Sequence, residues 1–534
     1  MSQLPDYVAS ATPNPPESRV GWLTTTAATY AGIMLWFVFW IGVPSGGGDA
    51  MGGTLSQGLP LALFGLFLAA AICYTCFYHV PGMLGMKTGL PLYIVGTSTY
   101  GVTGGFLMPG FLMGCLQFGW LSINGFFAGL GLAAIILRKP MDSPEVFMSA
   151  WHLGIGIVWA VVAAFVGLKG IKYVGMVASY MPIIPIVVLL ALLATTAGGV
   201  GKFDTKVMMD AAEKEKAAAA ETLKAYPTAE TLVTEELARH TDKDTGKTLE
   251  ALRVFVTEKV ADYQGIHKAS EVKPVTLYGS GLLGVLSLIC AYIVGFFATA
   301  GAAGCDFGSN NKDRKAVMMG GLVGIAGATI FTGAIALLVI AGSQGVEGIK
   351  ATTLNPLGNM DTLMGGTLGG VFMFLLAIAA FPSACFSSLI AANSFKTTLP
   401  KVNPFISCGI GTAVACGLII SGFAGQAGDV FTLIGASFGP VCGAMMADYL
   451  LSGKKWAGPR AGFNPAGWIS WVVGFFVGGI TLFVEVFMGG TMPFAIPCPP
   501  VAAFIVGFVL YYALAKAGME SPKLDMPQRI DMAD

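Results

Sequence analysis

Long apolar runs that carry no charged residue dominate this chain, as residues 58–78 and 402–426 show. About twenty apolar residues in a helix cross the ~30 Å hydrocarbon layer of a bilayer, and the period-two alternation of barrel strands is absent. The pattern predicts an all-α polytopic membrane protein with about 12 transmembrane helices. The expected spans are residues 22–57 (interrupted), 59–84, 105–137, 146–168, 173–198, 276–305, 316–343, 366–393, 403–424, 429–451, 466–488 and 493–516.

Composition supports the same class. Hydrophobic residues make up 55% of the 534 residues and charged residues 11%, whereas an average soluble domain is roughly one quarter charged. The histidines are scattered along the chain, and no HExxH, G-x-S-x-G or P-loop motif is present. Cys73 and Cys76 form a C-x-x-C inside an apolar run without a second pair nearby, which favours packing over a metal or redox role. The sequence thus predicts neither an enzyme nor a bound cofactor.

Basic residues favour alternate sides of the predicted spans. If the N-terminus is cytoplasmic, the short segments on that side hold most of them, and the opposite short loops hold only Arg138, Lys139 and Lys350. The positive-inside rule then places both termini in the cytoplasm, in a plasma (inner) membrane. The predicted divisions are an N-terminal tail (1–21), spans one to five (22–198), an extracytoplasmic insert (199–275), spans six to ten (276–451), spans eleven and twelve (452–516) and a C-terminal tail (517–534).

The insert differs from the rest of the chain. It is rich in Ala, Glu and Lys, and from residue 228 to 263 apolar residues recur at helical spacing. We expect two or three short helices outside the membrane. Its acids and bases nearly balance, which favours a solvated helical cap over a module that binds an anionic partner.

Two of the apolar spans contain residues that interrupt a helix. In the first, Pro44 and Ser45 precede three glycines and Asp49; in the sixth, Gly301 and Gly304 follow Thr299. Unwound backbone at membrane depth lines a cavity in many transporters, and spans five apart are the partners expected in a five-plus-five inverted repeat. For an isolated glycine pair, close helix packing is the alternative. Asp49 is either a coupling carboxylate or a hydrated residue at the outer surface.

Several segments resemble the nucleobase-cation symporter family, which includes cytosine permeases and hydantoin transporters. The matching segments are GMKTGLPLYIVGTSTYGVTGGFLMPGFLMGCLQFGW (85–120), VGFFATAGAAGCDF (294–307), FTLIGASFGPVCGAMMADYLL (431–451) and FNPAGWISW (463–471). They occur from the second to the eleventh span in the family's order. The resemblance implies a LeuT-type core of five plus five helices with two extra helices, alternating access, and a flat heterocycle held between aromatic rings.

The same resemblance implies binding residues. Trp120 occupies the position of the family's stacking tryptophan, and Asn124, one helical turn later, that of an amide that bonds the ligand. Phe297 falls at the second stacking position, where a hydantoin transporter has tryptophan. Gln117 is a further candidate for the ligand's rim, and Ser387 and Ser388 for the contact from span eight; helix packing is an equal explanation for these three.

A cation site is also implied. In sodium-coupled relatives, carbonyls at the first break and hydroxyls of span eight bind Na⁺; here these would be the carbonyls of Trp40 and Val43 and the hydroxyl of Ser383. The chain departs from the family pattern at Phe381 and Pro382, so coupling to Na⁺ and coupling to H⁺, with Asp49 as the titrating group, both stay open.

The predicted function is symport of a small planar nitrogen heterocycle, such as cytosine or a related nucleobase, driven by Na⁺ or H⁺. The alternative is a receptor of transporter-like fold that senses a ligand without moving it. A channel is disfavoured because the chain has two isolated breaks rather than a continuous polar path. Beyond the substrate and the lipid bilayer, we expect no nucleic acid and no obligatory protein partner.

Overall fold

The computed structural model describes residues 4–47, 50–141, 143, 145–169, 180–241, 260, 263, 270, 281–346, 353–399, 401–488 and 496–526. Within these ranges, ten helical segments are long and apolar enough to cross a membrane. The shorter apolar helix Pro404–Ile420 and an interrupted first span bring the total to the 12 that the sequence predicts. The chain is an all-helical integral membrane protein, as predicted.

The first five spans follow the predicted order. Their elements are α2 (Ala28–Leu35) and α3 (Phe37–Ile41); α4 (Leu59–Ile72), η4 (Cys73–Tyr78) and α5 (His79–Thr88); α7 (Thr97–Gly105), η5 (Phe106–Phe111) and α8 (Leu112–Leu137); α9 (Ala150–Lys169); and α11 (Ile183–Thr196).

Seven spans follow the insert. Their elements are α15 (Leu282–Ala302) and α16 (Gly304–Gly308); α17 (Arg314–Gly321), η8 (Leu322–Gly327) and α18 (Ala328–Gly345); α20 (Gly366–Thr398); α21 (Pro404–Ile420); α22 (Ala427–Leu451); α23 (Pro465–Met488); and α24 (Pro499–Lys516). Short helical elements precede, extend or connect the spans: α1 (Asp6–Ala9), η1 (Pro16–Ser18), η2 (Leu23–Ala27), η3 (Gly53–Leu55), α6 (Leu92–Val95), η6 (Ala197–Lys202), α19 (Met360–Met364) and η9 (Phe423–Gly425).

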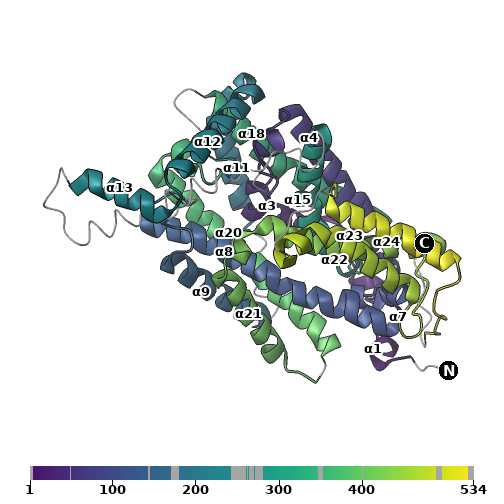
Figure 1. Cartoon of the computed structure of the whole chain (residues 1–534). Helices are drawn as coiled ribbons and strands as arrows, with labels where there is room; N and C mark the ends of the chain where they lie inside the picture. Colours follow the sequence, from purple (N-terminus) through teal and green to yellow (C-terminus); the bar gives the residue numbers. More distant parts are fainter. Residues whose placement is uncertain are drawn as a thin grey trace.

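The spans form two closely packed groups (Figure 1). Spans one, two, six and seven pack together through α2, α4, α5, α15, α16 and α18, and we call them the bundle. Spans three, four, eight and nine pack together through α8, α9, α20 and α21, and we call them the scaffold. In each group the members are related by an offset of five spans, which is the pairing expected of a five-plus-five repeat. A π-helical turn also recurs at this offset, as η4 in span two and η8 in span seven.

Small residues allow the scaffold helices to approach closely. A Cβ atom on Gly129 of α8 would lie 2.8 Å from the backbone nitrogen of Gly156 in α9, and one on Gly167 of α9 would lie 2.3 Å from the carbonyl oxygen of Cys385 in α20. Backbones in such contact gain van der Waals packing, which drives helix association in lipid. Any larger side chain at these positions would push the helices apart.

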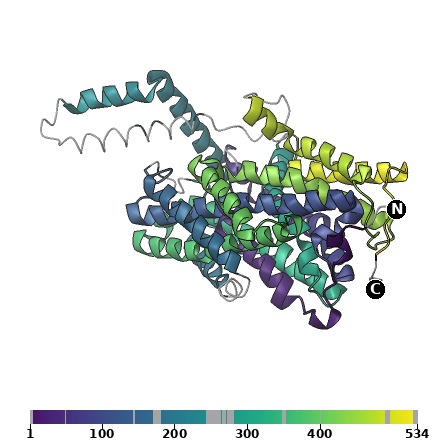
Figure 2. The same cartoon turned by 90° about the horizontal axis from the view of Figure 1, so that it is seen from below.

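The insert forms two helices in its described part, α12 (Thr205–Ala225) and α13 (Ala229–Thr241). Asp204 caps α12, since its carboxylate accepts a bond of 2.8 Å from the backbone N–H of Lys206. Both helices project beyond the packed spans (Figure 2). The start of α12 contacts the turn after span one, where Met208 and Met209 lie beside Gly52.

Candidate functional site

The first span is interrupted twice. The turn at residues 42–47 contains Pro44 and two glycines with positive φ, Gly46 and Gly47, at the place where the sequence predicts a break. A second break lies one and a half turns earlier, because Trp36 has an extended backbone (φ −61°, ψ 127°) between α2 and α3. The indole N–H of Trp40 donates to the carbonyl of Leu35 (3.3 Å), which satisfies one acceptor that the earlier break leaves without a helical partner.

The sixth span breaks at Ala303, between the predicted glycines. The helix α15 runs for 21 residues before this point, and α16 follows for 5 residues. The side chains that face the scaffold therefore come from a regular helix, and the interruption lies at its end.

An aromatic cluster joins the bundle, the scaffold and α22. Trp120 of α8 is partly exposed, and its ring stacks on Phe431 of α22 (5.3 Å between centroids, 29° between planes). Phe296 of α15 meets it edge-on at 5.2 Å, and Trp36 at 6.1 Å. The indole N–H of Trp120 donates to the hydroxyl of Thr299 in α15 at 3.1 Å. The predicted stacking tryptophan thus lies where the two helix groups meet.

The aromatic ring of α15 that lies beside Trp120 is that of Phe296. The family resemblance predicts the next residue, Phe297, at this position. Phe297 is fully buried and contacts Tyr30 of α2, with 5.7 Å between ring centroids. Consecutive residues of an α-helix project about 100° apart, so the two phenylalanines face different partners. Phe297 therefore supports the inner packing of the bundle in this structure.

Asn124 lies within the scaffold. Its amide nitrogen donates to the carbonyl of Ala380 (3.0 Å) and to the hydroxyl of Ser383 (3.2 Å), and its oxygen accepts from the indole of Trp159 (3.0 Å). Both amide hydrogens are used, and one lone pair of the oxygen is left. In this arrangement Asn124 can accept a hydrogen bond from a ligand but has none to donate.

The other candidates for the ligand's rim lie in α8 and α20. Gln117 is buried, and its amide nitrogen lies 3.5 Å from the sulfur of Met113. The hydroxyl of Ser387 donates to the carbonyl of Ser383 at 3.4 Å. Ser388 is fully buried with no partner for its hydroxyl, and its Cβ atom lies close to Gly167 of α9. Ser388 therefore faces the interior of the scaffold.

The residues predicted for a cation site are engaged in different places. The carbonyl of Val43 accepts from the hydroxyl of Thr54 (3.1 Å), and that of Trp40 from the backbone N–H of Val43 (3.4 Å). Ser383 of α20 donates to the carbonyl of Ala380 (2.8 Å) and accepts from Asn124. Asp49 lies outside the described residues. The geometry thus assigns the predicted carbonyls and the hydroxyl to two separate hydrogen-bond networks.

Part of the chain matches a known family. Residues 267–458 match the family described as "Permease for cytosine/purines, uracil, thiamine, allantoin". This match confirms the predicted resemblance to the nucleobase-cation symporters. No curated protein matches the chain.

Two solved structures share the fold of nearly the whole chain. Mhp1, a nucleobase-cation-symport-1 family transporter, in a closed conformation with bromovinylhydantoin bound is 12% identical, with a TM-score of 0.54 over 95% of this chain and 96% of that one. Inward-facing Mhp1 is 13% identical, with a TM-score of 0.55 over 97% and 95%. The shared fold confirms the predicted five-plus-five architecture. The matched family is one of permeases, and both solved structures are of a transporter.

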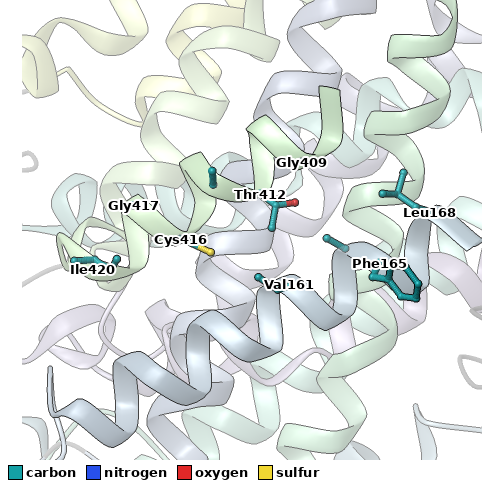
Figure 3. Close-up of a pocket in the computed structure, with 10 residues that line it drawn as sticks. Val161, Phe165, Leu168, Gly409, Thr412, Cys416, Gly417 and Ile420 are labelled. Carbon is teal, nitrogen blue, oxygen red and sulfur yellow. The ribbon is translucent and has the colours of Figure 1, made fainter. Parts of the chain in front are cut away.

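An apolar groove on the outside of the scaffold is a poor site for a heterocycle. It lies between α9 and α21 and is lined by side chains such as Val161, Phe165 and Ile420 (Figure 3). Thr412 is its one hydroxyl among the lining residues, and it donates to the carbonyl of Cys408 in its own helix (2.7 Å). A surface of this kind suits lipid tails, since it offers few groups that could hydrogen-bond the polar edge of a heterocycle.

Sequence reasoning missed three members of the aromatic cluster: Trp36, Phe296 and Phe431. All three are aromatic residues in apolar spans, where such residues are common, so the residue type alone does not indicate a binding site. The available hint is the four-residue spacing of Trp36 and Trp40, which places two indoles beside the interrupted part of span one.

Proposed function

We propose that this protein imports a small planar nitrogen heterocycle, such as cytosine or a related nucleobase, together with Na⁺ or H⁺. The observation that carries the proposal is the position of Trp120. Its ring is partly exposed at the junction of bundle and scaffold, and the bond to Thr299 restricts its orientation. A planar ligand stacked on a fixed indole gains apolar contact over a whole face, which is the main attraction available to a small aromatic solute.

The polar groups around this ring would read the edge of the ligand. Asn124 offers one acceptor, and Gln117 and Ser387 are further rim contacts from α8 and α20. Phe297 packs against Tyr30 in this structure and stays the candidate for the second stacking ring. Ser388 contributes from within the scaffold by holding α20 against α9.

Alternating access follows from the division into two helix groups. The bundle and the scaffold are each closely packed, and Trp120 with Thr299 bridges them. Movement of one group against the other would open the aromatic cluster to one side at a time. For the coupling ion, we propose that the same movement brings the carbonyls of Trp40 and Val43 and the hydroxyl of Ser383 together as Na⁺ ligands, since they lie in separate hydrogen-bond networks in this structure, and that Asp49 is the proton carrier if H⁺ is used.

The charge pattern supports a proposal for the orientation. We place both termini in the cytoplasm and the insert outside a plasma (inner) membrane, because the short basic segments then lie inside. A Na⁺ or H⁺ gradient directed inward would therefore drive uptake.

Two measurements test the function. Thermal shifts of the purified protein with cytosine, uracil, hypoxanthine, allantoin and hydantoin, with and without Na⁺, should identify a ligand that raises the melting temperature. Uptake of that ligand into proteoliposomes should then depend on an imposed Na⁺ or pH gradient. Binding without uptake would favour the receptor alternative, and the absence of both would refute the proposal.

A further inference from the structure

Trp36 carries a buried hydrogen-bond donor without a partner. Its side chain is 8% exposed, and the indole N–H meets no acceptor. Four other indoles of the described spans are bonded, Trp40 to Leu35, Trp120 to Thr299, Trp159 to Asn124 and Trp471 to Ser437, and Trp468 of α23 has a second buried indole N–H without a partner. Buried N–H groups are nearly always paired, so an exception calls for an explanation.

The position of Trp36 links this donor to the aromatic cluster. Its ring lies 6.1 Å from that of Trp120 and 6.1 Å from that of Phe296. Its backbone is the extended residue between α2 and α3, so the side chain stands at the earlier break of span one rather than on a regular helix face. No glycine or proline causes this break, and the packing of the ring against two other elements stabilises it.

We propose that the indole N–H of Trp36 donates a hydrogen bond to an acceptor on the rim of the bound heterocycle. This inference rests on the proposed function and narrows the ligand class. The ligand must carry an unprotonated ring nitrogen or a carbonyl oxygen at the edge that faces span one. Trp120 supplies the stacking face, whereas Trp36 selects among planar rings by their acceptors.

Substitution of Trp36 by Phe tests this role, because it removes the N–H and keeps an aromatic ring. Trp468 of α23 provides a matched control, since its indole nitrogen is also buried without a partner and its ring packs on Tyr100 and Phe463, away from the cluster. The dissociation constant of the tightest ligand among cytosine, uracil, hypoxanthine and hydantoin would be measured for wild type, Trp36→Phe and Trp468→Phe. We expect a loss of about tenfold in Trp36→Phe, the effect of one hydrogen bond, and less than about twofold in Trp468→Phe.

Analogues of the ligand separate a hydrogen bond from a packing effect. Each analogue lacks one acceptor, with a ring nitrogen replaced by C–H or a carbonyl by CH₂. One analogue should bind wild type about tenfold more weakly than its parent and should bind Trp36→Phe no worse than the parent does. Equal affinities of wild type and Trp36→Phe, or an equal loss for the parent and every analogue, would overturn the inference while the transport function stands. Failure of all four heterocycles to bind wild type would overturn both.

Discussion

The indole N–H of Trp120 in α8 donates a hydrogen bond of 3.1 Å to the hydroxyl of Thr299 in α15. This bond crosses from the scaffold to the bundle, so it restrains the ring at the boundary between the two groups. Phe431 stacks against the ring from α22. A third element thus closes around the same side chain.

Replacement of Trp120 by Ala should abolish uptake and leave folded protein in the membrane. The change removes the stacking surface, and a base stacked on an aromatic side chain gains roughly 1–3 kcal/mol, or about 5- to 150-fold in affinity. Ligand binding and proteoliposome uptake would be measured on the same preparation, with its elution profile as the check on folding.

Trp471→Ala is the matched control for that variant. Trp471 also stacks on a phenylalanine, Phe475, and bonds through its indole to the carbonyl of Ser437, but it lies in α23 outside the two groups. It should retain near wild-type affinity. Wild-type ligand affinity in Trp120→Ala would rule out the stacking role.

Asn124 joins three helices of the scaffold, and its loss should lower stability. In Asn124→Leu the indole of Trp159 loses its partner and the carbonyl of Ala380 keeps only its bond from Ser383, and an unpaired buried group costs roughly 1–3 kcal/mol. The melting temperature in detergent should fall clearly. Trp159→Phe removes only one of the hydrogen bonds of Asn124, so its melting temperature should lie between those of wild type and Asn124→Leu.

A ligand distinguishes the structural role of Asn124 from a direct contact. If the remaining lone pair of its oxygen accepts from the heterocycle, Asn124→Leu loses affinity beyond what the lower stability explains, whereas Trp159→Phe does not. Equal melting temperatures of Asn124→Leu and wild type would contradict the network.

The spans could be predicted from the sequence because lipid imposes a length and a composition on each one. The start of span three was predicted at residue 105, whereas α7 begins at Thr97 and is kinked at Gly101, whose backbone is not helical (φ 82°, ψ 164°). The polar run Thr97, Ser98 and Thr99 hid it, since these hydroxyls are satisfied inside the protein, that of Ser98 by the carboxylate of Asp448 at 2.6 Å. A hydropathy value treats a polar residue as unfavourable in a membrane span even when a partner distant in the sequence satisfies its hydrogen bonds.

The site was harder to predict for a related reason. The break at Pro44 follows from residues that interrupt a helix wherever they occur, so it can be predicted from the sequence. The break at Trp36 depends on the packing of its ring against rings of α8 and α15, which the sequence does not show. A shift of one residue along α15 turns the projecting side chain onto another face of the helix, so it decides whether Phe296 or Phe297 lies beside Trp120. Patterns therefore located the helices that form the cluster but could not select all of its members.

The insert should be separable in part from transport. Deletion of residues 227–268 with a short flexible linker keeps α12, whose Met208 packs beside Gly52 in the turn after span one. This variant should transport at a rate close to wild type, because α13 projects away from the spans (Figure 2). The longer deletion of residues 206–268 removes the methionines as well and should lower the melting temperature. Loss of uptake in well-folded 227–268 deletion protein would show that the insert takes part in transport.

A buried ion pair ties the loop after α22 to the start of α7. Arg460 donates to the carboxylate of Asp448 at 3.0 Å, with side-chain exposures of 2% and 4%, and it also pairs with Glu520 at 2.7 Å. The hydroxyls of Ser98 and Thr99 donate to the same carboxylate as Arg460. Three segments distant in sequence therefore meet at one charge.

Asp448→Asn should be the most destabilising of the conservative changes at this junction. It leaves Arg460 buried with its strongest counterion removed, and breaking such a pair costs roughly 3–5 kcal/mol. Glu520→Gln should cost less, at most about 1 kcal/mol, because the Glu520 side chain is 29% exposed and solvent screens its charge. Melting temperatures of both variants at low and high salt would measure this, and only the small effect of Glu520→Gln should depend on salt. A melting temperature of Asp448→Asn equal to that of Glu520→Gln would show that the buried charge contributes no more than the partly exposed one.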